Sequence, residues 1–173
     1  MLGHGHPVVL QAVRHQIARG AHFGLTHGAE VELARTIAEA LPSVEQIRFT
    51  ASGTEACMTA IRVARAATGR SKVLSFSGCY HGHSDGLLVN PRPRERVTFG
   101  QPGSDGIPAT VTQETIVAPY NDLEALETAI RQFGDEMACV IVEPVAANMG
   151  VVVPAQEFLP RLRDLTRHHG ILL

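Results

Sequence analysis

Apolar residues recur along the chain in two spacings, which predict helices and strands. Apolar positions three and four apart, the spacing of amphipathic helices, occur in residues 8–19, 30–41, 53–68, 122–133 and 157–168. Short apolar runs predict strands at 47–49, 72–76, 115–118 and 138–142, and residues 171–173 resemble the opening of another strand. Because strands alternate with helices from residue 47 onward, we expect a layered α/β fold with a mainly parallel sheet.

The same pattern predicts how the chain is organised. Residues 1–45 form a helical N-terminal part, and residues 46–173 form an α/β core. Residues 91–108 are rich in proline, glycine and charge, which predicts a long loop. Residues 87–89 fit either a helix end or a short strand.

Three polar clusters follow the predicted strands. They are Ser52-Gly53-Thr54, Cys79-Tyr80-His81 and the segment from Glu143 to Asn148. In parallel α/β sheets, ligands bind beyond the carboxyl ends of the strands. We therefore expect these clusters to converge on one ligand site.

The first cluster has the features of a phosphate-binding helix start. Ser52 lies three residues before Glu55, the spacing of a capping box. Free N–H groups and the positive end of the helix dipole would point at one place. Gly53 would let a ligand approach the backbone, and the hydroxyls of Ser52 and Thr54 could donate to a phosphate. The alternative is a well-capped helix that binds nothing.

The other two clusters each allow more than one interpretation. Tyr80 could stack on a planar cofactor, or it could be a surface tyrosine with a hydrogen-bonded hydroxyl. Glu143 could be catalytic or could bond neighbouring backbone. His81, His83 and Asp85 match the H-x-H-x-D spacing of metallohydrolases, but a dinuclear site needs another histidine where Gly86 stands, and further ligands later in the chain.

The composition of the chain argues against nucleic acid and membranes as binding partners. The formal net charge of −2 gives no basic face for nucleic acid, and no apolar run is long enough to span a membrane. Three widely spaced cysteines suggest reduced thiols in the cytoplasm. Lys72 is the only lysine, against 14 arginines.

The motifs resemble those of the class III, pyridoxal-phosphate-dependent aminotransferases, most of all their glutamate-1-semialdehyde 2,1-aminomutase branch. Ser52-Gly53-Thr54-Glu55-Ala56 is typical of the broad family. The run from Gly78 to His83, together with Asn148-Met149-Gly150, is more specific to the branch, because most class III transaminases have an acidic residue at the position of Asn148. The resemblance covers essentially the whole chain through these further segments: Gly3-His4-Gly5-His6-Pro7, Arg48-Phe49, Pro119-Tyr120-Asn121-Asp122 and Val142-Glu143-Pro144-Val145.

The resemblance implies a fold and a set of cofactor contacts. The fold is the fold type I large domain, with helices on both faces of a mostly parallel sheet. Ser52, Gly53 and Thr54 would hold the cofactor phosphate, Tyr80 would stack on the pyridine ring, and His81 would lie beside it. Glu143 would lie one layer behind these residues, and Asn148 would bond near the ring hydroxyl.

The resemblance also implies an activity. The branch exchanges amino groups within a small amino/keto substrate to give 5-aminolevulinate, a tetrapyrrole precursor, and works as a homodimer. The chain departs from the branch at Leu25-Thr26-His27, at 90–96 and at Ala147, segments that touch substrate entry and gating in the family. A class III transaminase with another amino donor or acceptor therefore stays open.

The family's Schiff-base lysine lies downstream of the last residue here. We therefore expect the chain to be an incomplete part of the large domain that binds the cofactor weakly or not at all and does not catalyse alone. Lys72 begins a strand, so it should lie at the opposite end from the phosphate-binding helix start.

Overall fold

The computed structural model describes residues 2–173, and the chain divides into two compact units between Phe49 and Thr50. The first unit contains α1 (Pro7–Ile17) and α2 (Gly28–Ala40), and neither helix has a buried residue. Pro7 begins α1, where its missing N–H costs nothing. His27 caps α2, because its Nδ1 accepts from the Ala29 N–H at 3.2 Å.

The strand predicted at 47–49 is wrong. These residues form no ladder with any strand of residues 2–173. An apolar run makes a strand only when a partner supplies the second half of the hydrogen bonds.

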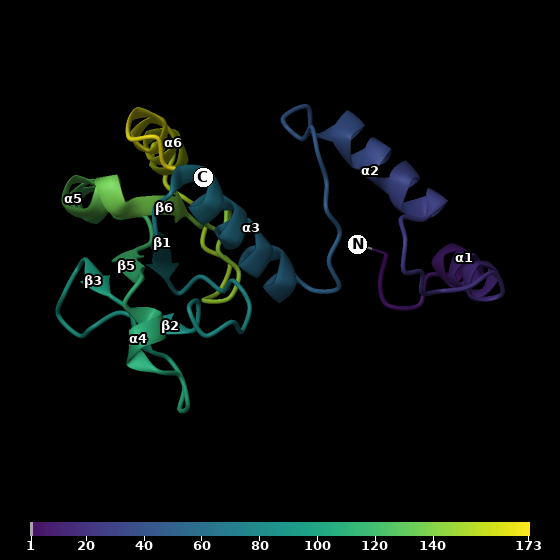
Figure 1. Cartoon of the computed structure of the whole chain (residues 1–173), viewed down its shortest axis with the longest axis horizontal. Coiled ribbons are helices and arrows are strands. Elements are labelled where there is room, and N and C mark those ends of the chain that lie inside the picture. The colour runs from purple at the N-terminus through teal and green to yellow at the C-terminus, as the bar shows by residue number, and fades with distance from the viewer. Residues whose placement is uncertain (1) are drawn as a thin grey trace. The chain divides into compact units, whose positions relative to one another are not determined.

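The second unit is built on a four-stranded sheet in the order β3-β5-β1-β6 (Figure 1). The central strand β1 (Lys72–Ser77) pairs in parallel with β5 (Thr115–Pro119) and with β6 (Met137–Val140). The short β3 (Thr98–Phe99) adds an antiparallel edge to β5. Leu172 forms a parallel bridge with Cys139, which confirms the strand opening predicted at the end of the chain. The sheet is therefore mainly parallel, as expected.

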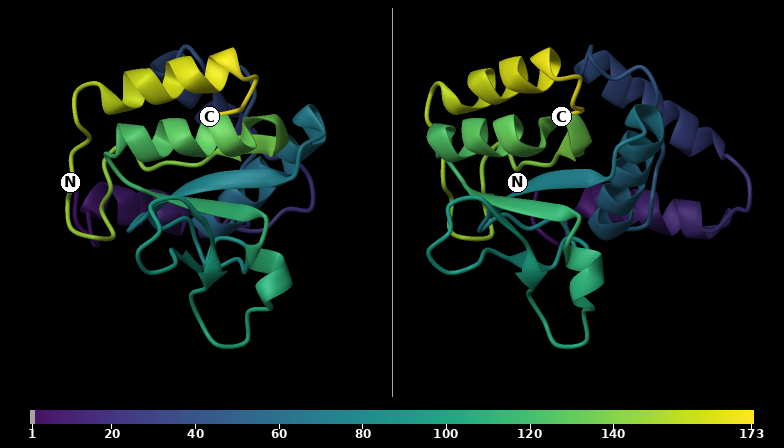
Figure 2. Two further views of the ribbon diagram at one scale, coloured as in Figure 1. Left: turned by 90° about the vertical axis from the view of Figure 1, so that its left-hand side faces the viewer. Right: turned by 60° about the vertical axis from the view of Figure 1, so that its left-hand side comes forward.

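Helices cover both faces of the sheet (Figure 2). On one face, α5 (Leu123–Phe133) and α6 (Phe158–His168) lie side by side and pack on the larger apolar core, which includes Leu74 and Ile116. On the other face, Ile61 and Ala64 of α3 (Gly53–Thr68) pack on Val73 and Cys139. Successive side chains of β1 thus point to opposite faces of the sheet, and each face has its own apolar core, as expected for an α/β fold.

The predicted loop at 91–108 is only partly irregular. It contains β3 and one strand of a small antiparallel pair, β2 (Val89–Asn90) with β4 (Gln101–Pro102). The short α4 (Ala109–Thr112) follows, and a 3₁₀ turn, η1 (Gly134–Glu136), leads into β6. Local composition favours a loop here, but pairing to residues far away in sequence produces short strands.

Arg70 ties together segments that lie far from it in the sequence. One nitrogen of its guanidinium lies within 2.9–3.4 Å of backbone carbonyl oxygens at or just before the start of β6 and after α6, those of Gly134, Met137, His169 and Gly170. The positive charge therefore sits where several carbonyls point outward. Within residues 2–173, no helix is long and apolar enough to cross a bilayer.

Candidate functional site

The carboxyl ends of the parallel strands lie at one edge of the sheet. β1 ends at Ser77 beside Pro119, the last residue of β5, and β6 runs in the same direction. The segments after these strands therefore meet at this edge. They include two of the polar clusters predicted from the sequence.

The third cluster is the start of α3. Ser52 is the N-cap, and its Oγ accepts from the Glu55 N–H at 3.2 Å. The predicted capping box is only half formed, because the Glu55 carboxylate accepts instead from the Ala51 N–H at 2.8 Å. Gly53 and Thr54 begin the first turn, which offers their N–H groups no acceptor within the helix.

Thr54 joins the start of α3 to the turn after β1. Its Oγ1 accepts from the His83 N–H at 3.2 Å, so its own proton stays available to donate. Gly82 has a φ of 92°, and a Cβ there would lie 2.6 Å from the Thr54 Cα. Only glycine allows this approach, which brings the Thr54 hydroxyl beside the turn that carries Tyr80 and His81.

Glu143 joins the turn after β1 to the segment after β6. Its Oε1 accepts from the Tyr80 N–H at 2.7 Å, and its Oε2 accepts from the Ala147 N–H at 2.9 Å. Burial acts to raise the pKa of Glu143, but these two N–H groups and the nearby His81 together hold that pKa below its ordinary value. Glu143 is therefore an ionised carboxylate whose two oxygens hold backbone, one of the two interpretations that the sequence left open.

Asn148 adds a second connection between the same two segments. Its Nδ2 donates to the Gly78 carbonyl at 3.4 Å, which leaves Oδ1 free to accept. Gly78 has a φ of 87°, and a Cβ there would overlap the Met149 side chain. The two motifs that are typical of the aminomutase branch thus contact each other.

His81 is buried beneath this site, with 9% of its surface exposed. Burial lowers the pKa of His81 below its ordinary value, although the Glu143 carboxylate opposes the change. Its Nε2 is a buried polar atom without a hydrogen-bond partner in residues 2–173. A buried, unpaired ring nitrogen costs free energy unless a ligand or water satisfies it. Tyr80, in contrast, is about half exposed (52%), so a ligand could reach its ring.

Lys72 lies at the other end of β1, as expected. It is the first residue of the strand, and its Nζ is 3.0 Å from Glu136 and 3.8 Å from Glu114. The length of β1 separates it from Tyr80. Its amine is therefore held in ion pairs away from the predicted site.

The H-x-H-x-D segment does not assemble as a metal site. Nowhere in residues 2–173 do three side chains of His, Cys, Asp or Glu come together in a way that could hold a metal ion. The backbone of His83 instead bonds Thr54, and Asp85 is exposed. All three cysteines are free thiols.

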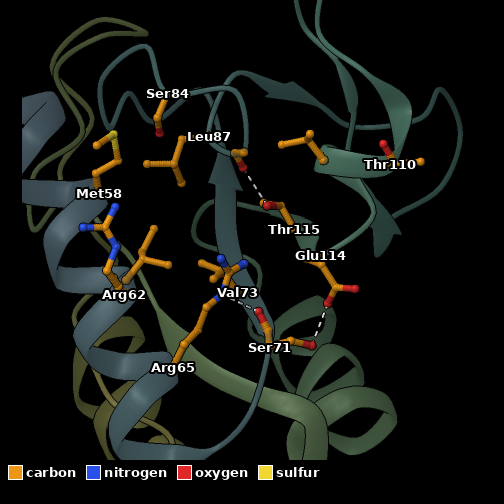
Figure 3. Close-up of a pocket in the computed structure, with 13 residues that line it drawn as sticks. Met58, Arg62, Arg65, Ser71, Val73, Ser84, Leu87, Thr110, Glu114 and Thr115 are labelled. Carbon is orange, nitrogen blue, oxygen red and sulfur yellow. Dashed lines mark hydrogen bonds between the residues drawn. The ribbon is translucent and has the colours of Figure 1, made fainter.

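A hollow of about 590 Å³ lies away from the predicted site residues (Figure 3). Met58, Arg62 and Arg65 of α3 line one side, and Thr110 of α4 lines the other. None of the predicted site residues lines it. The hollow is a second place where an anion could bind, so an experiment on phosphate binding has to separate the two.

Two residues at this edge escaped the sequence analysis as site residues. The Tyr120 hydroxyl lies 3.1 Å from the Glu143 carbonyl oxygen, and the Asn121 amide bonds backbone at Val153 and Ala155. The signal that could have indicated Asn121 is its place just after a predicted strand, in the segment Pro119-Tyr120-Asn121-Asp122.

Comparison with known proteins decides the family. The model of the family described as aminotransferase class III matches residues 1–173. The chain belongs to the class III aminotransferases. This membership agrees with the fold type I architecture and makes the H-x-H-x-D metallohydrolase interpretation wrong.

Individual relatives agree with the family. The chain is 54% identical over 173 residues to the glutamate-1-semialdehyde 2,1-aminomutase of Syntrophus aciditrophicus, and covers 100% of its own length but 40% of that protein. A solved transaminase with PLP bound matches 98% of this chain and 40% of its own, with a TM-score of 0.89 and 34% identity. A glutamate-1-semialdehyde aminomutase from Pseudomonas aeruginosa PAO1 matches 99% and 37%, with a TM-score of 0.86 and 32% identity. The chain thus spans about two fifths of the length of these relatives.

Proposed function

We propose that this chain supplies the phosphate- and ring-binding part of a pyridoxal-phosphate-dependent aminomutase that acts on glutamate 1-semialdehyde. The observation that carries the proposal is the convergence of the start of α3 with the two segments that follow β1 and β6, joined by Thr54 and Glu143. The 54% identity to a glutamate-1-semialdehyde 2,1-aminomutase supports the choice of reaction. Residues 46–173 correspond to the core of the cofactor domain, and residues 1–45 to its helical N-terminal part.

The residues present fit pyridoxal phosphate. The first turn of α3 offers two N–H groups and the Thr54 hydroxyl, the donors that a phosphate requires. A Cβ on Gly53 would meet no protein atom within 4 Å, so the space in front of the backbone is open. The unpaired Nε2 of His81 lies buried in the adjoining turn.

Each predicted residue then has a distinct task. Gly53 and Thr54 bind the phosphate, while Ser52 fixes the first turn as its cap and can turn its hydroxyl toward the ligand. Tyr80 stacks on the pyridine ring, and His81 lies beside that ring. Glu143 holds the backbone of Tyr80 in place. Asn148, whose Oδ1 is free, bonds near the ring hydroxyl.

The bound cofactor supplies an electron sink and a carrier for amino groups. The chain contributes binding and orientation: the helix start fixes one end of the ligand, and the turn after β1 fixes its ring. We further propose that the complete enzyme acts on a small amino/keto substrate as a homodimer. The three free thiols support a reducing compartment such as the cytoplasm.

A second candidate is a class III transaminase with another amino donor or acceptor. The solved transaminase that matches 98% of the chain at a TM-score of 0.89 supports it. The unusual residues at Leu25-Thr26-His27, at 90–96 and at Ala147 support it too, because the resemblance places them in segments that take part in substrate entry and gating in the family. Both candidates require the same phosphate and ring contacts.

Two experiments test these proposals. In the first, inorganic phosphate and then pyridoxal phosphate are titrated into the ¹⁵N-labelled chain, and amide shifts are followed by NMR. Shifts at Gly53 and Thr54 are expected, and saturable shifts confined to Arg62, Arg65 and their neighbours would instead place the anion in the hollow of Figure 3. In the second, the chain replaces the matching part of the Syntrophus aciditrophicus enzyme. Formation of 5-aminolevulinate supports the aminomutase, whereas a fusion that only transaminates supports the second candidate.

A further inference from the structure

The segment that carries Glu143 and Asn148 is a loop held at its two ends by two neighbouring residues, Tyr120 and Asn121. It runs from the end of β6 toward α6, and most of its residues are exposed. An exposed loop orders only if specific contacts offset its conformational entropy. Three sets of backbone contacts provide this order.

The first set holds the start of the loop. The Tyr120 hydroxyl lies 3.1 Å from the Glu143 carbonyl oxygen and 3.3 Å from that of Pro144, so its single proton is shared between them. The Tyr120 ring is fixed in turn, since it packs edge-on against Phe76 at 6.0 Å and at a tilt of 58° against Phe158 at 5.2 Å between ring centroids. Burial and the nearby Cys79 and Glu143 raise the pKa of Tyr120, which keeps the hydroxyl a donor.

The second set holds the far end of the loop. The Asn121 Nδ2 donates to the Val153 carbonyl at 3.3 Å, and its Oδ1 accepts from the Ala155 N–H at 2.9 Å. Asn121 has a φ of 64°, a left-handed conformation that asparagine tolerates better than most residues. Between the two ends, Ala146 and Val152 close the loop with hydrogen bonds of 3.1 and 2.8 Å.

We infer that Tyr120 and Asn121 are positioning residues, which fix the loop that carries Glu143 and Asn148 against the Tyr80 turn. The inference rests on the proposed function for the role of those residues toward the cofactor. Neither Tyr120 nor Asn121 needs to touch the ligand. Their task is to hold the ring-binding side of the site in place before the ligand arrives, which lowers the ordering cost of binding.

The test uses Tyr120→Phe, which keeps the ring, and Asn121→Gly, which keeps the backbone conformation and removes the amide. Amide hydrogen exchange at Ala147 is expected to be about fivefold faster in each variant, the factor that loss of one ordinary hydrogen bond brings. Exchange within α5 should not change. Tyr80→Phe is the matched control for exchange, since within residues 2–173 the Tyr80 hydroxyl makes no hydrogen bond.

Ligand binding separates positioning from general destabilisation. Each variant should bind pyridoxal phosphate at least about fivefold more weakly, while inorganic phosphate, which needs only the start of α3, should bind as in the unaltered chain. Unchanged exchange at Ala147 in both variants would overturn the inference. Equal losses for both ligands would also overturn it, because they would indicate a structural role alone. The same affinities are measured in the fusion with the Syntrophus aciditrophicus enzyme. A fusion that bound neither ligand would make the proposed function fail, and the exchange result would still decide whether these residues hold the loop.

Discussion

Gly53→Ala should have opposite effects on the stability of the folded chain and on its affinity for phosphate. Gly53 is the first residue of α3, its backbone does not require glycine, and a Cβ there would meet no protein atom within 4 Å. Alanine should therefore stabilise the folded chain by about 0.4–1 kcal/mol, because it restricts the unfolded chain more than glycine does. For a chain of this size, that gain raises the Tm by about 1–4 °C.

The same methyl group should weaken phosphate binding. It would stand in the open space in front of the Gly53 and Thr54 N–H groups. Loss of one hydrogen bond to a charged group costs about 1.5–3 kcal/mol, which corresponds to about a 10- to 150-fold weaker affinity. Stability and affinity should thus change in opposite directions.

Gly69→Ala at the other end of α3 is the matched control. A Cβ at Gly69 would also meet no atom within 4 Å, but its φ is 67°. Alanine there should cost about 1–2 kcal/mol of stability and leave phosphate binding alone. Urea unfolding followed by circular dichroism, with and without inorganic phosphate, measures both quantities. A Gly53→Ala chain that gained stability and bound phosphate normally would refute the assignment of this turn to the phosphate.

Four further predictions concern single side chains. In a complete enzyme such as the fusion described above, Thr54→Ala should weaken pyridoxal phosphate binding by about 1–3 kcal/mol in a titration, and Thr54→Ser should restore most of it; equal affinity of all three enzymes would remove Thr54 from the site. Tyr80→Phe should keep most of the affinity for pyridoxal phosphate and Tyr80→Ala should lose it, whereas equal losses would point to the hydroxyl. The pKa of His81 is lowered in the folded state, so the unfolded chain binds a proton at His81 at a higher pH than the folded chain does. The free energy of unfolding therefore decreases as pH falls from about 6.5 through the folded-state pKa. The His81→Asn chain should lose less unfolding free energy between pH 7.5 and pH 5, and an identical loss would show that His81 does not titrate this way. After borohydride reduction of the chain with pyridoxal phosphate, mass spectrometry should find no stoichiometric label on Lys72, and the chain alone should show no turnover. Specific labelling of Lys72 together with turnover would contradict the placement of Lys72.

The sheet and its helices could be predicted because apolar runs, polar turns and helix caps are features of the local sequence. Strands β1 and β5 are apolar runs between polar turns, and α5 begins at Asp122, whose carboxylate accepts from the Ala125 N–H at 2.9 Å. The convergence of Tyr80 and Glu143 followed from the strand-end rule, whereas Thr54 reaches the same turn through its bond to His83 without a strand before it. These predictions needed no knowledge of distant contacts.

The remaining features depend on strand-pairing and hydrogen-bond partners that cannot be predicted from the local sequence. The apolar run at 47–49 pairs with no strand of residues 2–173, and β3 became a strand only through β5. The carboxylate of Glu55 could reach the Ala51 N–H as well as that of Ser52, and the spacing alone does not choose between them. Tyr120 and Asn121 bond residues 23 to 34 positions away, so their contacts are invisible to any local pattern.

The carbonyl contacts of Arg70 also bear on how the chain assembles during synthesis. The guanidinium bonds Met137, 67 positions later, and Gly170, 100 positions later. At a translation rate of about 5–20 residues per second, Arg70 is made roughly 5–20 s before Gly170. Until β6 has been made, the neighbouring apolar strand β1 lacks at least one of its two partner strands, and contacts of such sequence separation form slowly. The nascent chain therefore exposes its central strand for seconds, long enough for a molecular chaperone to bind it.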